Sequence, residues 1–125
     1  IGMLAKFGAT VHVFAKGHPH LDKSLDETEI RNDVANGIAQ LRELIADDSF
    51  DMLIMDEILI SVRDGYLAES ELISFIKDKP ARLELVLTGR GATASVIELA
   101  DYVSEIQKIA HPYDKGVTSR GGIEF

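Results

Sequence analysis

Two short apolar runs, each followed by polar or charged residues, constrain the fold more than any other feature of this sequence. The first occupies residues 50–55 and ends in Asp56-Glu57, and the second occupies residues 83–87 and is followed by Thr88-Gly89-Arg90. Apolar runs of this length are typical of buried parallel strands. Because ligands bind at the carboxyl ends of the strands in an open α/β sheet, these polar groups are expected to lie together at that edge.

The segments before, between and after the two runs have the residue spacing of helices. Ser24 and Glu27 have the spacing of a capping box, which predicts a helix that begins after Ser24. Residues 68–77 and 92–100 predict two more helices, one before and one after the second run. The first of these three helices is predicted to be the longest, because apolar residues recur at helical spacing at Ile30, Val34, Ile38, Leu41 and Ile45.

Two further segments, residues 10–14 and 102–106, have the composition of short strands. Strands that alternate with helices predict successive βα units, and therefore a mostly parallel sheet that helices cover on both faces. We expect residues 1–125 to form one α/β domain, since this length suits a single core and the sequence contains no linker or low-complexity tract.

Composition excludes several classes of site. The chain has no cysteine, which rules out disulfides and zinc–thiolate centres, and its formal net charge of −8 disfavours a nucleic-acid partner. No apolar stretch is long enough to span a membrane and no signal peptide is visible, so a cytoplasmic location and no membrane partner are expected.

The acidic pair Asp56-Glu57 has the position of a Walker B motif, in which a carboxylate after an apolar strand holds Mg²⁺. In the turn Thr88-Gly89-Arg90, the guanidinium is a forked donor suited to phosphate oxygens, and the glycine allows a ligand to approach the backbone. Taken singly, each motif is equally compatible with a solvated turn at the end of a strand. No residue is assigned as a catalytic acid, base or nucleophile.

A third pattern, H-x-H-x-D at His18, His20 and Asp22, resembles the start of a metal-hydrolase signature, but Lys23 stands where that signature has a histidine. A solvated loop, or a loop that contacts a ligand through its imidazoles, is therefore favoured. His111 precedes a proline, and a structural capping role is expected for it.

Together these motifs form an ordered series: D-M-L-I-M-D-E at 51–57, G-Y-L at 65–67, V-L-T-G-R-G at 86–91, I-E-L-A-D-Y-V-S-E-I at 97–106, H-P-Y-D-K-G at 111–116 and G-G-I-E-F at 121–125. In this order they resemble the ATP:corrinoid adenosyltransferases of the CobA/CobO/BtuR type. The resemblance covers the chain from about Val11 onward.

The resemblance implies a P-loop NTPase-like fold, usually in a homodimer, that transfers the 5′-deoxyadenosyl group of ATP to the cobalt of a reduced corrinoid with the help of Mg²⁺. By matching position, Asp56 and Glu57 would hold the metal, and Thr88, Gly89 and Arg90 would bind the nucleotide. A flavoprotein reductase is an implied partner. The loop that contains Gly17, His18 and His20 would face the corrinoid, with the two histidines in place of the family's aromatic residues, and Ala110 replaces the lysine that usually precedes His111.

The phosphate-binding P-loop, G-x-x-x-x-G-K-[ST], does not occur in these 125 residues. The resemblance implies that this motif would precede Ile1, so the chain alone is expected to be inactive. The alternative hypothesis is a non-catalytic α/β remnant that binds a corrinoid or a protein partner without turnover.

Overall fold

The computed structural model describes residues 2–14, 26–47 and 49–123. Strands β1 (Met52–Met55) and β2 (Glu84–Leu87) form a two-stranded parallel sheet. Their register pairs Met52 with Glu84 and Met55 with Leu87, so that the two strands end level with each other. The α/β class is confirmed, and the two apolar runs are the strands that the sequence predicts.

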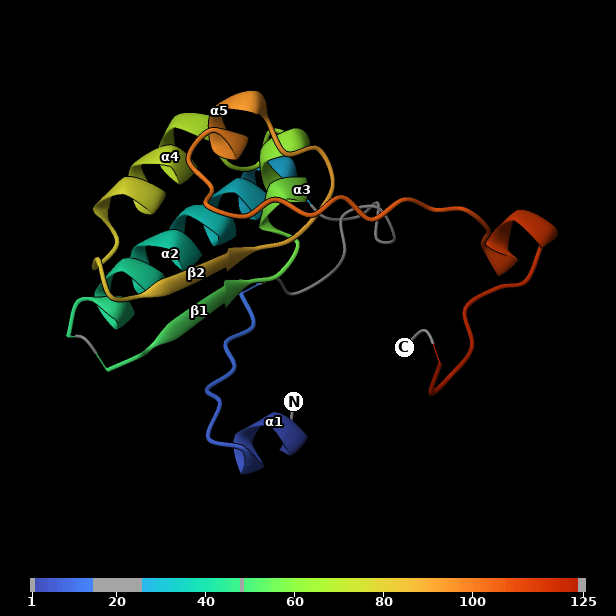
Figure 1. Cartoon of the computed structure of the whole chain (residues 1–125), viewed down its shortest axis with the longest axis horizontal. Helices are drawn as coiled ribbons and strands as arrows, with labels where there is room; N and C mark the ends of the chain where they lie inside the picture. Colours follow the sequence, from blue (N-terminus) through green and yellow to red (C-terminus); the bar gives the residue numbers. More distant parts are fainter. Residues whose placement is uncertain (1, 15–25, 48, 124–125) are drawn as a thin grey trace.

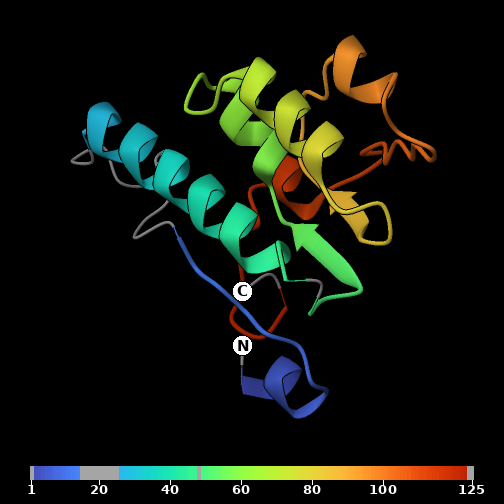
Figure 2. The ribbon, with the colours of Figure 1, turned by 90° about the vertical axis from the view of Figure 1, so that its left-hand side faces the viewer.

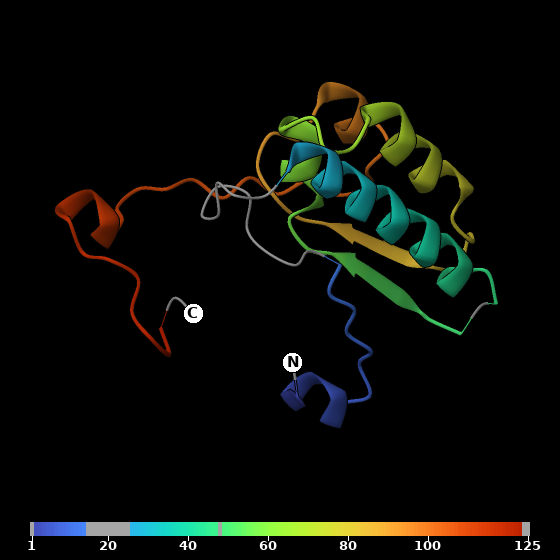
Figure 3. The same cartoon turned by 180° about the vertical axis from the view of Figure 1, so that it is seen from behind.

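The helices that follow and precede these strands lie over one face of the sheet, as Figures 1 and 3 show from opposite sides. Figure 2 shows α2 and α4 side by side in this layer. The short elements α1 (Gly2–Lys6) and η1 (Pro112–Lys115) lie apart from it (Figure 1). The helical layer consists of α2 (Glu27–Ile45), α3 (Ile58–Arg63), α4 (Glu69–Asp78) and α5 (Ala94–Ile97).

The core lies between this helical layer and the facing side of the strands. α2 contributes its predicted apolar stripe, and Leu72 and Phe75 of α4 are the most deeply buried large side chains. These residues pack in one cluster with buried residues of the strands, turns and short helices, namely Met55, Leu59, Leu67, Leu83 and Val96. The predicted inward face of α4 is thereby confirmed.

The start of α2 differs from the prediction. The N-cap is Asp26, whose Oδ1 accepts a hydrogen bond of 3.1 Å from the backbone N–H of Thr28, and Glu27 is the first helical residue. The predicted capping box with Ser24 as N-cap is therefore wrong, because Asp26 supplies the acceptor two residues later.

The two additional strands predicted from composition are also wrong. Residues 10–14 make no strand pairing, and Phe14 packs instead against α2 near Gly37. Residues 102–106 form no helix or strand, and Tyr102 and Ile106 are 95% and 96% exposed. Figure 1 shows the chain between α5 and η1 running past the helical layer and then out to η1. A strand-like composition forms a strand only where a neighbouring backbone accepts its hydrogen bonds.

As a result, the helices of the described residues cover one face of the sheet, and for this part of the chain the prediction that helices cover both faces is wrong. Met52 and Ile54 of β1 point away from the helices and are 53% and 59% exposed, and Val86 of β2 is exposed beside them. Met55, on the opposite face of the same strand, is only 5% exposed. Among the helices of the described residues, none has the length and apolar character needed to cross a membrane.

Candidate functional site

The polar residues after β1 and β2 meet at the carboxyl edge of the sheet, as the sequence predicts. The backbone N–H of Thr88 donates to the carbonyl of Met55 over 3.2 Å, which extends the strand pairing by one residue. Beyond it, the Thr88 hydroxyl lies 2.6 Å from Asp56 Oδ1 and 2.8 Å from the backbone nitrogen of Glu57. The structure thus connects Asp56, Glu57 and Thr88 directly.

Glu57 has a left-handed backbone conformation, with a φ of 58°, and it is the N-cap of α3. It is the single non-glycine residue with positive φ in the part of the chain that the structure describes. Such a conformation costs about 1–3 kcal/mol, and it persists where surrounding contacts hold it. Two hydrogen bonds hold it here. The Glu57 N–H donates to the Thr88 hydroxyl, and the Ile60 N–H donates to the Glu57 carbonyl over 2.9 Å.

Gly89 allows β2 to pass close to the start of α3. Its φ is 132°, and a Cβ atom on it would lie 3.0 Å from the Cβ and 3.2 Å from the backbone nitrogen of Leu59. The Leu59 N–H donates to the Thr88 carbonyl over 3.2 Å. Close packing against α3 is therefore sufficient to explain this glycine. From the sequence, this glycine was expected to let a ligand approach the backbone, since α3, the helix that it contacts, was not predicted.

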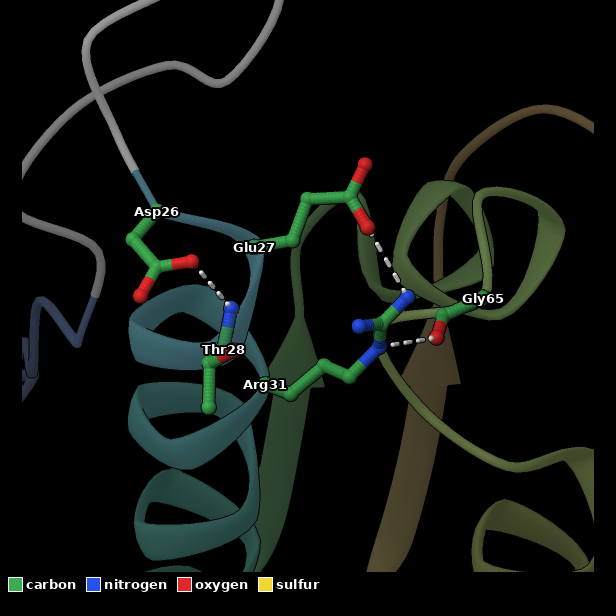
Figure 4. Close-up of polar contacts among 5 residues, drawn as sticks. All are labelled: Asp26, Glu27, Thr28, Arg31 and Gly65. Carbon is green, nitrogen blue, oxygen red and sulfur yellow. Dashed lines mark hydrogen bonds and ion pairs between the residues drawn. The ribbon is translucent and has the colours of Figure 1, made fainter.

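Arg31 connects α2 to the same edge of the sheet, a contact that sequence reasoning missed. Its Nε donates to the carbonyl of Gly65 over 3.2 Å, and its Nη2 pairs with Glu27 over 3.1 Å (Figure 4). Gly65 follows α3, so the guanidinium joins the first turn of α2 to the turn between α3 and α4. No local pattern predicts a bond between residues 34 positions apart.

Arg90 is exposed, and within the described ranges it has no hydrogen bond or ion pair. The predicted corrinoid-facing residues Gly17, His18 and His20 lie outside the described residues. The histidine at 111 has a capping role, because its Nδ1 accepts a hydrogen bond of 3.1 Å from the Tyr113 N–H at the start of η1.

The donor set at the strand ends fits Mg²⁺ held together with a substrate. Asp56 and Glu57 are both exposed and supply carboxylate oxygens, the ligand type that Mg²⁺ prefers. Across the described part of the chain, no group of three or more His, Cys, Asp or Glu side chains could hold a metal by itself. Mg²⁺ in nucleotide sites needs only one or two carboxylates, because waters and substrate phosphates complete its coordination.

Comparison with known proteins agrees with the motif order. The family model of the ATP:corrinoid adenosyltransferases BtuR/CobO/CobP matches residues 2–125. The chain belongs to this family. The corrinoid adenosyltransferase of a Sinorhizobium species is 41% identical over 85 residues, which is 67% of this chain and 40% of that protein.

Other relatives within the corrinoid adenosyltransferase family give the same result. The corrinoid adenosyltransferase of Escherichia coli K12 and the corrinoid adenosyltransferase CobA of Salmonella typhimurium are each 34% identical over 84 residues. Both alignments cover 67% of this chain and 43% of the relative. The aligned region of this chain thus spans about two fifths of the length of these curated relatives.

Proposed function

We propose that the protein that carries this chain transfers the 5′-deoxyadenosyl group of ATP to the cobalt of a reduced corrinoid. Membership of the family and the names of the relatives support this reaction class. The structural observation that carries it is the direct contact of Thr88 with Asp56 and Glu57, since it gathers the residues of two family motifs at one sheet edge.

In this proposal Asp56 and Glu57 hold Mg²⁺, and the turn Thr88-Gly89-Arg90 lies beside the nucleotide. When bound, Mg²⁺ neutralises negative charge on the triphosphate. Arg90 has no partner among the described residues, so its guanidinium is available for phosphate oxygens. The loop with Gly17, His18 and His20 faces the corrinoid, by its position in the motif order.

The chemical step is a nucleophilic displacement. The electron pair of cobalt(I) attacks the 5′ carbon of the ribose, the carbon–oxygen bond breaks, and triphosphate leaves with that bond's electron pair. The protein's contribution is to bind and orient the reactants and to offset charge on the leaving group, which requires no catalytic acid or base among Asp56, Glu57 and Thr88.

Further parts of the proposal rest on the family resemblance. They are a P-loop NTPase-like fold that includes residues 1–125 as one domain, a homodimer, a flavoprotein reductase that supplies the reduced corrinoid, and a cytoplasmic location. The parallel pairing of β1 and β2 is consistent with such a fold.

The test is an assay of cobalt–carbon bond formation, followed by absorbance, with the natural protein, ATP, Mg²⁺ and a chemically reduced corrinoid. We expect turnover by the natural protein and a loss of roughly 10²-fold or more in Glu57→Gln. Glu84→Gln is the matched control, because Glu84 is an exposed carboxylate at the opposite end of β2. Failure of the natural protein to form the bond would refute the proposed reaction. Full activity in Glu57→Gln would refute the metal-binding role of that residue.

A further inference from the structure

The hydroxyl of Thr88 is engaged twice, and the chemistry of its partners fixes the direction of both hydrogen bonds. The backbone N–H of Glu57, 2.8 Å away, can only donate, so Thr88 Oγ1 accepts there. The carboxylate of Asp56, 2.6 Å away, accepts, so the single hydroxyl hydrogen points to Asp56 Oδ1. While both bonds are present, Thr88 has no hydrogen left to donate to a ligand.

We infer that Thr88 is a positioning residue, which orients the Asp56 carboxylate and the Glu57 backbone for metal binding and does not itself bind the nucleotide phosphates. The inference rests on the proposed function and refines the nucleotide contact expected for Thr88. Phosphate oxygens accept hydrogen bonds and therefore need donors. Arg90 can supply them, whereas Thr88 can do so only by releasing Asp56.

Asp56 is exposed, and a free carboxylate there would sample several rotamers. The bond from Thr88 occupies Oδ1 and restrains the side chain. Within the described residues, the other oxygen of Asp56 has no hydrogen-bond partner and remains available to a metal or to its bound water. Hydrogen bonds of this kind to a metal-binding carboxylate orient it, and their removal typically lowers metal affinity.

The backbone of Thr88 acts on the same turn. Its N–H donates to the Met55 carbonyl and its carbonyl accepts from the Leu59 N–H, each over 3.2 Å. The Thr88 hydroxyl also accepts from the Glu57 N–H. The N–H, the carbonyl and the hydroxyl of Thr88 therefore all hold the segment from Met55 to Leu59, which includes the left-handed Glu57. The Asp56 carboxylate and the backbone of Glu57 are therefore positioned from the neighbouring strand.

Two substitutions of the natural protein separate this role from a nucleotide contact. Thr88→Val keeps the shape and removes the hydroxyl, and Thr88→Ser keeps the hydroxyl. Mn²⁺ serves as the probe, and its binding in the presence of saturating ATP is measured by the electron paramagnetic resonance signal of the free ion. We expect Thr88→Val to weaken Mn²⁺ binding roughly 10- to 100-fold and Thr88→Ser to remain close to the natural protein.

Kinetics and a double variant give a second measurement. At saturating Mg²⁺, the KM of Thr88→Val for ATP should stay unchanged. In an Asp56→Asn background, Thr88→Val should cause little further loss of metal affinity, because the two residues act as a unit. Unaltered Mn²⁺ binding in Thr88→Val would overturn the inference. The inference would also be overturned if Thr88→Val lost ATP affinity even at saturating metal and this loss added fully to the loss caused by Asp56→Asn. A residue that contacts the nucleotide directly would behave in this way.

The proposed function and this inference can fail separately. If the natural protein binds Mn²⁺ with ATP and forms the cobalt–carbon bond, but Thr88→Val binds Mn²⁺ equally well, only the positioning role is wrong. If the natural protein forms no such bond, the proposed reaction is wrong, and the Mn²⁺ titrations still decide the role of Thr88. Should Thr88→Val not fold, Thr88→Cys, with its weak S–H donor, replaces it with the same expected direction of effect.

Discussion

Gly89 packs directly against Leu59, so closely that a Cβ atom on the glycine would lie 3.0 Å from the Cβ of Leu59. The contact joins the end of β2 to the first turn of α3, and it is made between the two segments that carry the candidate metal-binding and nucleotide-binding residues. The spacing of the site therefore depends on a backbone position that has no room for a side chain.

We predict that Gly89→Ala destabilises the protein by roughly 2 kcal/mol or more, because it combines a strained φ with a steric overlap. Gly65→Ala is the matched control: Gly65 also has a positive φ, 76°, but a Cβ there would meet no atom within 4 Å. The control should lose only about 1 kcal/mol. Urea unfolding of both variants measures the difference, and equal losses would show that the contact with Leu59 contributes nothing.

Glu57 gives a second prediction, in which stability and function change in opposite directions. Glu57→Gly removes the strain of a left-handed non-glycine residue and should raise the free energy of unfolding by up to about 1 kcal/mol. Glu57→Gln keeps that backbone strain and should leave stability nearly unchanged. Both variants lose the carboxylate, so both should lose Mg²⁺-dependent activity.

The measurement is urea unfolding of both variants beside the activity assay. A Glu57→Gly protein that is less stable than Glu57→Gln would contradict a strained backbone at this position. The result would also separate the two contributions of Glu57, its backbone conformation and its charge.

The parts of this fold that the sequence predicts are those determined by neighbours along the chain. α2 and α4 follow from apolar residues three and four positions apart, and β1 and β2 follow from short apolar runs. The meeting of Asp56 with Thr88 was predictable because parallel strands in register end at one edge. The prediction required no knowledge of the side-chain contacts.

The parts that it does not predict depend on partners far away in the sequence. Residues 10–14 and 102–106 have strand-like compositions, but composition does not specify a neighbouring strand, and the structure gives them none. α3 was missed because Ile58 to Val62 is almost continuously apolar and shows no helical alternation. The two bonds of the Thr88 hydroxyl span 31 and 32 positions, which no local pattern encodes.

The pH dependence of stability should include a contribution from Asp78 at the end of α4. Hydrogen bonds from the Ser74 hydroxyl, 2.8 Å away, and from Arg42, 3.2 Å away, lower the pKa of Asp78 below its usual 3.8. A carboxylate whose pKa is lower in the folded state stabilises the fold above the unfolded pKa, and this contribution is lost as the pH falls through the folded value.

The Asp78 contribution should therefore be fully present at neutral pH, should begin to fall as the pH approaches 3.8 and should be lost below the lowered pKa of Asp78 in the folded state. Asp78→Asn removes it, so the variant should lose less stability than the natural sequence when the pH is lowered through this range. Unfolding free energies measured across the range test this, with Ser74→Ala as a variant that removes the first of the two causes. The same acid sensitivity in Asp78→Asn as in the natural sequence would contradict the assignment. The effect is small, since Asp78 is exposed.

The last prediction concerns Gly37, a glycine inside α2 whose presence is explained by Phe14. A Cβ on Gly37 would lie 3.0 Å from Cγ and 3.3 Å from Cβ of Phe14. Alanine in a helix interior is normally about 1 kcal/mol more favourable than glycine. In the natural sequence, Gly37→Ala should give no such gain, because the new methyl group displaces the phenylalanine. In a Phe14→Gly background, which removes both of these side-chain atoms, the same substitution should stabilise α2 by about 1 kcal/mol.

Asn36→Ala is the control for this cycle, because Asn36 is an exposed neighbour in the same helix and should gain equally in both backgrounds. Four urea unfolding curves give the coupling energy between positions 14 and 37. A gain from Gly37→Ala that is the same with and without Phe14 would mean that the residue 10–14 segment does not pack on α2. A gain that appears only without Phe14 would locate that segment on the helix by measurement, and would show that Gly37 was retained for packing at the expense of helix propensity.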